Sequence, residues 1–161
     1  METLVLETKG TAGDAGGQVP RDQSAPHGTV RTRVREGQGM RLITRDELKE
    51  ESDGAGDLKL LFVLGEWQYH AAHIPGSANL PCSPDLYRSE DTLKGLVPDD
   101  DIVVYCSSKT CWASIAVYHY LVSRGYRNVR RYAGGLEDWE HAGYPLDGEM
   151  AAAKTRMRNA S

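Results

Sequence analysis

Short apolar runs alternate along the chain with segments in which apolar residues recur at helical spacing. Five of these runs predict strands by their length and composition, at residues 40–43, 58–64, 78–80, 102–105 and 129–132. The second run is almost continuously apolar, which is typical of a strand buried on both faces of a sheet. We therefore expect a sheet that is covered on both sides.

Helices are predicted between these strands. Thr44 and Glu47 match the capping-box pattern, in which each side chain satisfies a backbone N–H group at the start of a helix. Ser89 is placed to cap another helix, and Gly125 is placed to end one. The predicted helices span residues 45–51, 66–72, 90–96, 112–124 and 136–141. This alternation predicts an α/β fold with a central, mostly parallel sheet and helices on both faces.

The composition divides the chain into three parts. Residues 1–39 contain little apolar material to bury, so we expect a flexible N-terminal arm. Residues 40–148 hold the predicted elements of the folded domain, and residues 149–161 form a C-terminal tail without a clear apolar face. Within the arm, residues 29–35 alternate Val and Thr with Arg. That alternation predicts an exposed edge strand or a solvated basic patch, with docking to an acidic partner as the alternative.

Charge and cysteine content limit the function. The chain has 161 residues, a formal net charge of −4 and three cysteines. The negative charge argues against nucleic-acid binding, and no apolar run reaches the roughly 18 residues that a membrane helix needs. We recognise no secretory signal, and three irregularly spaced cysteines are no disulfide framework. We therefore expect a cytoplasmic protein with free thiols that binds neither nucleic acid nor membrane.

Cys106 lies between the predicted strand 102–105 and the predicted helix 112–124. In parallel α/β sheets, ligands bind at the carboxyl ends of the strands, where this cysteine falls. We expect the backbone N–H groups of residues 107–112 to point at the sulfur, lower the pKa of the thiol and stabilise a thiolate or a persulfide. The alternative is that Cys106 only packs at the strand end, as buried free cysteines often do.

Three stretches of residues 40–148 resemble signatures of the rhodanese-like (sulfurtransferase) family, in the order and spacing of that family. Residues 69–81 read YHAAHIPGSANLP, residues 103–106 read VVYC, and residues 125–145 run from GYRNV through YAGGLEDW to AGYP. The resemblance implies the three-layer rhodanese-like fold. It also implies that Cys106 corresponds to the catalytic cysteine of the family.

By this resemblance, the protein is expected to be a thiosulfate or persulfide sulfurtransferase. Cys106 would take a sulfane sulfur from thiosulfate or a persulfide donor, and a thiol or cyanide acceptor would remove it. Two other functions stay open: a persulfide carrier with a protein donor or acceptor, and a non-catalytic interaction or regulatory module. No cofactor is implied. The histidines and cysteines lack the short paired spacing of zinc sites, so we expect no metal.

The loop after Cys106 is the expected substrate-binding site. Its residues are Ser107, Ser108, Lys109, Thr110, Cys111 and Trp112. Fold-related phosphatases have a loop one residue longer that ends in a phosphate-gripping arginine, and Trp112 holds that position here, which argues against phosphate chemistry. Lys109 either attracts an anionic donor or points into solvent. Cys111 either resolves the Cys106 persulfide by forming a disulfide or packs at the start of the helix, which we favour.

The largest departure from the family pattern lies at the end of the predicted strand 58–64. Phe62 and Leu64 stand where the family usually has an aspartate and an arginine. The family's aspartate helps to hold the active-site loop, and its arginine adds charge nearby. These replacements lower the expected efficiency of thiosulfate turnover but not the expectation for the fold. His73 invites a general-base role, but the family position is structural, and we expect it to brace the turn at residues 75–76.

Overall fold

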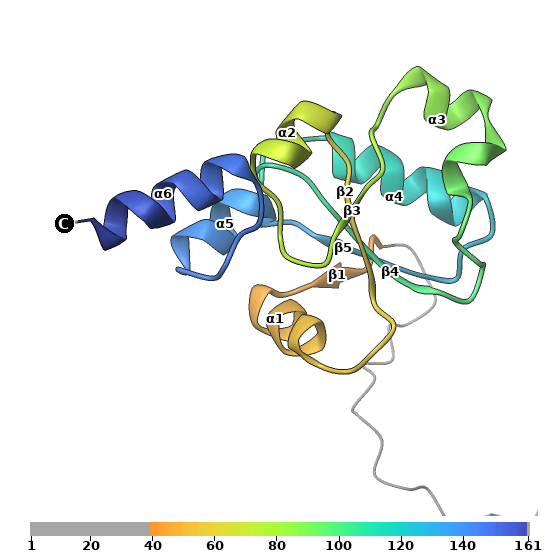
Figure 1. Ribbon diagram of the computed structural model, residues 1–161. Coiled ribbons are helices and arrows are strands. Elements are labelled where there is room, and N and C mark those ends of the chain that lie inside the picture. Colours follow the sequence, from red (N-terminus) through yellow and green to blue (C-terminus); the bar gives the residue numbers. More distant parts are fainter. Residues whose placement is uncertain (1–38, 161) are drawn as a thin grey trace, which may run out of the picture. The chain divides into compact units, whose positions relative to one another are not determined.

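The computed structural model describes residues 39–160, and its centre is a parallel five-stranded sheet (Figure 1). The strands are β1 (Leu42–Ile43), β2 (Lys59–Phe62), β3 (Ala78–Asn79), β4 (Asp101–Tyr105) and β5 (Asn128–Tyr132). Their order across the sheet is β1-β5-β4-β2-β3, and each neighbouring pair runs parallel. The expected arm up to residue 38, with its predicted strand at 29–35, lies outside the described residues.

Helices cover both faces of this sheet. They are α1 (Arg45–Asp53), α2 (Glu66–Ala71), α3 (Pro84–Arg88), α4 (Ala113–Ser123), α5 (Gly135–His141) and α6 (Glu149–Asn159), with a 3-10 helix η1 at Glu90–Leu93. α3 and α4 contribute Leu86 and Leu121 to the apolar cluster on one face, and α1 and α5 contribute Leu48 and Trp139 to the cluster on the other. In Figure 1, α1 and α4 lie on opposite sides of the sheet. The predicted three-layer α/β fold is confirmed.

β4 shows why the sheet must be covered on both sides. Ile102 and Val104 belong to the cluster on the α4 face, and Val103 and Tyr105 belong to the cluster on the α1 face. All four side chains are fully buried, because successive residues of a strand point to opposite faces and both faces carry helices here. Cys106 directly follows this buried strand, so the sheet holds the backbone at that residue in place.

The start of α1 has the capping box that the sequence predicts. The Thr44 hydroxyl accepts a hydrogen bond from the backbone N–H of Glu47 at 3.3 Å, and the Glu47 carboxylate accepts one from the backbone N–H of Thr44 at 2.9 Å. The backbone and side-chain hydrogen bonds from Thr44 stabilise the charged form of Glu47 and lower the pKa of its carboxyl group.

The structure corrects the predicted helix 90–96. Only the 3-10 helix η1 forms there, and Gly95 has a φ of +90°, a left-handed conformation that ends the turn. Ser89 does cap this segment, since its hydroxyl accepts from the backbone N–H of Asp91 at 3.2 Å. An additional helix, α3, begins with Pro84, whose fixed φ suits the first turn of a helix. That proline is the sequence signal for α3.

Residues expected to form a C-terminal tail are helical in α6, from Glu149 to Asn159. Ala151 is buried, and Gly148 brings the start of α6 close to the end of α2. A Cβ atom at Gly148 would lie 2.5 Å from the carbonyl oxygen of Ala71, and the φ of Gly148 is +119°, so glycine is required at this position. The folded part therefore continues beyond residue 148.

Candidate active site

Cys106 is the first residue after β4, at the carboxyl end of the sheet. We call residues 106–112 the cysteine loop; α4 begins directly after it at Ala113. The Cys106 residue is 1% exposed and belongs to the apolar cluster on the α4 face. This position at a strand end is consistent with both roles considered for Cys106, a reactive thiol and a packed core residue.

The hydrogen bonds of the Cys106 sulfur differ from those expected from the sequence. The Cys106 thiol donates to the hydroxyl of Ser114 at 3.4 Å, to the carbonyl of Cys111 at 3.4 Å and to the carbonyl of Ser108 at 3.6 Å. The two carbonyl acceptors can only stabilise the protonated thiol, whereas the loop N–H groups were expected to face an anion.

The predicted lowering of the Cys106 pKa is accordingly wrong for the thiol. Burial raises the pKa of Cys106 most, because a thiolate loses its hydration, and the neighbouring Cys111 side chain raises it further. The hydroxyl and the backbone N–H of Ser114 act in the opposite direction but do not outweigh the burial. The loss of hydration at the buried sulfur thus outweighs the dipoles at the start of α4.

Ser114 connects the cysteine to a buried arginine. The Ser114 side chain is fully buried in the first turn of α4, and its hydroxyl accepts a hydrogen bond from Nε of Arg131 at 2.8 Å. Arg131 lies on β5 and is only 7% exposed, and its Nη2 atom is buried without a hydrogen-bond partner. Arg131 is not among the residues predicted for the site. The sequence signal for a buried arginine is the pair Arg130-Arg131 in a strand that is covered on both faces. Successive residues of a strand point to opposite faces, so each of the two arginines faces a different side of the sheet.

The start of α5 braces the cysteine loop. The backbone N–H of Leu136 donates to the carbonyl of Cys106 at 2.9 Å, and that of Glu137 donates to the carbonyl of Ser107 at 2.8 Å. Gly135 permits this approach: its φ is +69°, and a Cβ atom there would lie 2.6 Å from the Cys106 carbonyl oxygen. The Gly-Gly pair at the start of α5 thus fixes the backbone of the loop.

The other loop residues surround the sulfur unevenly. Ser107, Lys109 and Thr110 are exposed, Ser108 is half-buried, and Trp112 is 68% exposed. Cys111 is half-buried, packs against the apolar cluster on the α4 face, and its side chain acts directly on Cys106. The structure brings Cys106, Cys111 and Ser114 together and leaves the exposed residues at the surface of the loop.

The two replacements at the end of β2 leave no charge beside the loop at those positions. Phe62 is 1% exposed, and its ring packs on Tyr105 with ring centres 5.2 Å apart. The Asn79 side chain donates to the carbonyls of Phe62 at 3.0 Å and Leu64 at 2.8 Å. An amide therefore holds the chain after β2, while α5 holds the cysteine loop.

His73 makes structural contacts. Its Nδ1 atom lies 2.7 Å from the carbonyl oxygen of Tyr69, and its ring stacks on that of Tyr69 with centres 3.9 Å apart. Its backbone exchanges hydrogen bonds with that of Asp147. These contacts support the structural role over the general-base role.

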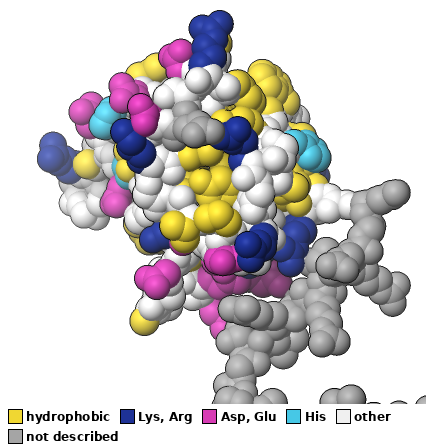
Figure 2. All heavy atoms as spheres, turned by 90° about the vertical axis from the view of Figure 1, so that its right-hand side faces the viewer, with side chains coloured by type: hydrophobic (Ala, Val, Ile, Leu, Met, Phe, Trp, Pro, Cys, Tyr) yellow, Lys and Arg dark blue, Asp and Glu magenta, His cyan; other side chains and the backbone are white. Residues whose placement is uncertain are grey.

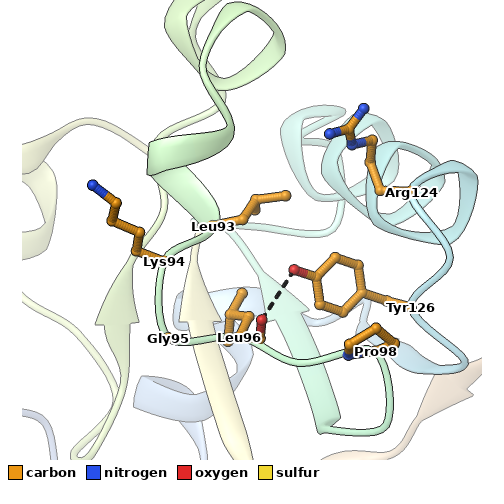
Figure 3. Close-up of a pocket in the computed structure, with 7 residues that line it drawn as sticks. All are labelled: Leu93, Lys94, Gly95, Leu96, Pro98, Arg124 and Tyr126. Atoms are coloured by element: carbon orange, nitrogen blue, oxygen red, sulfur yellow. Dashed lines mark hydrogen bonds between the residues drawn. The ribbon is translucent and has the colours of Figure 1, made fainter.

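A cavity of about 280 Å³ lies away from Cys106. Leu93, Leu96 and Tyr126 line it, and the Tyr126 hydroxyl donates to the Leu96 carbonyl at 3.4 Å (Figure 3). These residues precede β4 and β5, so the cavity lies at the amino ends of these strands, opposite the end that carries Cys106. Cys106 therefore lies outside this cavity. Figure 2 shows apolar side chains gathered on one face of the molecule, with Lys, Arg, Asp and Glu side chains around them.

Residues 39–160 hold neither a cluster of metal-ligating side chains nor a membrane-spanning helix. No three His, Cys, Asp or Glu side chains there are grouped to hold a metal ion. No helix in that part of the chain has the length and apolar character needed to cross a membrane.

Comparison with known proteins identifies the family. The model of the rhodanese-like domain matches residues 44–142, and the chain belongs to this family. The solution structure of the rhodanese-like domain of the Alr3790 protein from Anabaena sp. has a TM-score of 0.58 and 28% identity, and the match covers 68% of this chain and 80% of that domain. The thiosulfate sulfurtransferase of Pseudomonas aeruginosa has a TM-score of 0.57 at 21% identity, covering 68% of this chain and 20% of that protein, and shares the fold.

Two curated relatives are similar over part of their length. The HTH-type transcriptional regulator Rv0324 of Mycobacterium tuberculosis is 35% identical over 105 residues, which are 65% of this chain and 44% of the relative. The sulfur carrier protein TtuD of Thermus thermophilus is 34% identical over 94 residues, which are 50% of this chain and 32% of the relative. The chain spans less than half the length of each of these relatives.

Proposed function

We propose that this protein transfers sulfane sulfur through a persulfide on Cys106. The observation that carries the proposal is the position of Cys106, at the carboxyl end of a central strand in a rhodanese-like domain and in contact with the Ser114 hydroxyl. Membership of the family and similarity to a sulfur carrier support sulfur transfer as the class of activity. Ser107, Ser108, Lys109, Thr110, Cys111 and Trp112 form the loop that meets the donor.

The chemistry proceeds in two displacement steps. The Cys106 thiolate attacks the sulfane sulfur of thiosulfate, a Cys106–sulfur bond forms, the sulfur–sulfur bond of thiosulfate breaks, and sulfite leaves with the electron pair. Cyanide or a thiolate then attacks the outer sulfur of the persulfide, and Cys106 leaves as a thiolate. With a low-molecular-weight persulfide as donor, the leaving group of the first step is a thiolate.

Burial of Cys106 works against the first step. Because burial raises the pKa of the thiol, the protonated form dominates at neutral pH, and only the thiolate is the nucleophile. A donor must also reach a residue that is 1% exposed, next to the exposed loop residues Ser107, Lys109 and Thr110. Slow turnover with small donors is therefore expected, in a cytoplasmic setting where the thiol stays reduced.

A persulfide carrier is the second candidate function. It is favoured by the similarity to TtuD and by Phe62 and Leu64, which remove the charges that the family usually has near the loop. A carrier takes sulfur from a protein persulfide and delivers it to a second protein. It would load from a protein donor faster than from thiosulfate.

The test is intact-protein mass spectrometry after incubation with thiosulfate and, separately, with a cysteine persulfide. The wild-type protein should gain the mass of one sulfur atom, and Cys106→Ser should gain none. Cys82→Ser is the matched control, since Cys82 lies outside the cysteine loop, and it should load like the wild type. A wild-type protein that gains no sulfur from either donor would refute the proposal and leave a non-catalytic module.

Loading from the two donors separates the candidates. Loading from both donors, followed by thiocyanate formation with cyanide, supports the sulfurtransferase. Loading from the persulfide alone, with slow discharge to cyanide, supports the carrier.

A further inference from the structure

A line of three side chains joins β5 to the cysteine loop. Arg131 lies opposite Val104 of β4 in the register of the sheet, two residues before Cys106. Its Nε atom donates to the Ser114 hydroxyl at 2.8 Å, and the Cys106 sulfur lies 3.4 Å from the same oxygen. Each of the three residues is at least nine-tenths buried. Water therefore contributes little to the stabilisation of a charge at this place.

The arginine fixes the direction of the hydrogen bonds. A guanidinium group only donates, so one lone pair of the Ser114 oxygen is taken by Arg131. The hydroxyl proton of Ser114 is left free to turn towards the sulfur. With a protonated thiol, Cys106 donates to Ser114; with a sulfur anion, Ser114 can donate to the sulfur while it still accepts from Arg131. The same three groups thus accommodate both charge states, and the buried positive charge favours the anion.

Arg131 has no anion of its own. In residues 39–160, no carboxylate lies within ion-pair distance of its guanidinium, and Nη2 has no hydrogen-bond partner. A buried charge without a partner is costly and is normally balanced by a group of opposite charge. The neighbouring Arg130, on the other face of the sheet, is balanced, because it pairs with Glu51 at 2.6 Å and with Asp101 at 2.9 Å.

The groups around Cys106 leave few other sources of charge. The titratable side chain that acts on Cys106 from the loop is Cys111, which disfavours a second negative charge beside it. The chain directly after β2 contributes Val63 and Leu64, which are apolar. The positive charge that reaches Cys106 through a hydrogen-bonded group therefore comes from β5.

We propose that Arg131 is a positioning residue of this site, which acts through the Ser114 hydroxyl to stabilise a negatively charged sulfur on Cys106. The inference rests on the proposed function in so far as that anion is the persulfide of the catalytic cycle. It assigns the missing partner of the buried guanidinium: the charge is balanced when Cys106 is a thiolate or a persulfide.

The test measures the pH dependence of Cys106 alkylation by iodoacetamide, with the modified peptide quantified by mass spectrometry. Arg131→Met removes the charge and retains the apolar stem. It should raise the apparent pKa of the Cys106 thiol by about one pH unit, with about a tenfold slower persulfide loading at neutral pH. Circular dichroism should show a folded protein, because replacing a buried ion by an apolar side chain of similar size is often neutral or stabilising.

A matched control and a second variant complete the test. Arg130→Met removes the same charge one residue away on the opposite face, and it should leave the pKa of Cys106 unchanged. Ser114→Ala interrupts the link and keeps the arginine, so it should raise the pKa of Cys106 as well. In the double variant of Arg131 and Ser114, the effects should not add, because both act through one connection.

Three results would overturn the inference: an unchanged pKa in Arg131→Met, an equal shift in Arg130→Met, or additive effects in the double variant. Alkylation needs no sulfur donor, so it tests Arg131 independently of sulfur transfer. If Cys106 never accepts sulfur but its pKa still depends on Arg131, the proposed function fails and the role of Arg131 stands. If Cys106 accepts sulfur but its pKa does not depend on Arg131, the proposed function stands and the proposed role of Arg131 fails.

Discussion

The backbone N–H of Leu136 donates to the carbonyl oxygen of Cys106 at 2.9 Å, so the start of α5 is fastened to the first residue of the cysteine loop. This contact joins two residues that lie 30 positions apart in the sequence, the last residue of VVYC and the residue that follows the Gly-Gly turn. No carboxylate at the end of β2 is present to hold the cysteine loop. Backbone N–H groups at the start of α5 hold the loop by their hydrogen bonds instead. The geometry of the sulfur site therefore depends on a turn that contains no reactive residue.

Gly135→Ala should damage the site through this turn. A Cβ atom would lie 2.6 Å from the Cys106 carbonyl oxygen, and the φ of +69° is strained for alanine. We expect a loss of about 2 kcal/mol or more in the free energy of unfolding, measured in urea, together with slower sulfur loading. Gly125→Ala is the control: its φ is +93°, but no atom lies within 4 Å of the added Cβ.

Gly125→Ala should lower the free energy of unfolding by about 1 kcal/mol because of backbone strain, and it should leave sulfur loading unchanged. Equal losses of stability in the two variants would contradict the close packing of α5 on the cysteine loop.

The three cysteines should react with iodoacetamide at different rates in the native protein. Cys106 is buried with a raised pKa, whereas Cys82 and Cys111 are half-buried. Because the rate follows thiolate content and exposure, Cys106 should be alkylated last at neutral pH, and the difference should vanish in denaturant. Peptide mass spectrometry over time measures the order, and faster labelling of Cys106 than of Cys82 would contradict it.

Tyr105→Phe tests the buried polar contacts at the end of β4. The Tyr105 hydroxyl accepts from the backbone N–H of Ile74 at 2.9 Å and lies 2.8 Å from the Ser77 hydroxyl. Removing it leaves the buried N–H of Ile74 without an acceptor, so the free energy of unfolding should fall by about 1 to 3 kcal/mol. Tyr87→Phe, at a half-exposed position, should change stability by less than about 0.5 kcal/mol. A Tyr105→Phe protein as stable as the wild type would count against these contacts.

The capping box of α1 should add a pH dependence to stability. Its hydrogen bonds lower the pKa of Glu47 in the folded protein, so this contribution is present above the unfolded pKa of Glu and disappears as the pH falls through the folded value. Thr44→Ala should cost about 1 kcal/mol at pH 7. The difference in free energy of unfolding between Thr44→Ala and the wild type should shrink at acidic pH. A difference that grows as the pH falls would contradict a lowered pKa of Glu47 in the folded protein.

The strands and most helices could be predicted because their signals are local. The apolar run at 58–64 and the capping box at Thr44 determine β2 and α1 without reference to distant residues. The helix expected at 90–96 failed because Gly95 takes a left-handed conformation and the better helical start was Pro84. A proline at the first turn of a short helix is a weaker signal than a serine cap followed by acidic residues.

The candidate site was predictable in position but not in its electrostatics. The position of Cys106 follows from the strand-to-helix pattern, but the direction of its pKa depends on burial, which a local argument at a helix end does not include. The part played by Arg131 depends on the pairing of β5 with β4 and on the approach of α4. Such contacts join residues that are far apart in the chain, so sequence spacing alone does not reveal them.

Locating the transferred sulfur tests the central claim most directly. Wild-type protein is loaded with a persulfide donor, alkylated and digested, and the peptides are analysed before and after addition of cyanide. The account predicts one additional sulfur atom on the peptide that contains Cys106, lost with cyanide as an equal amount of thiocyanate forms. Sulfur on Cys82 or Cys111 in place of Cys106, or on no cysteine at all, would contradict it.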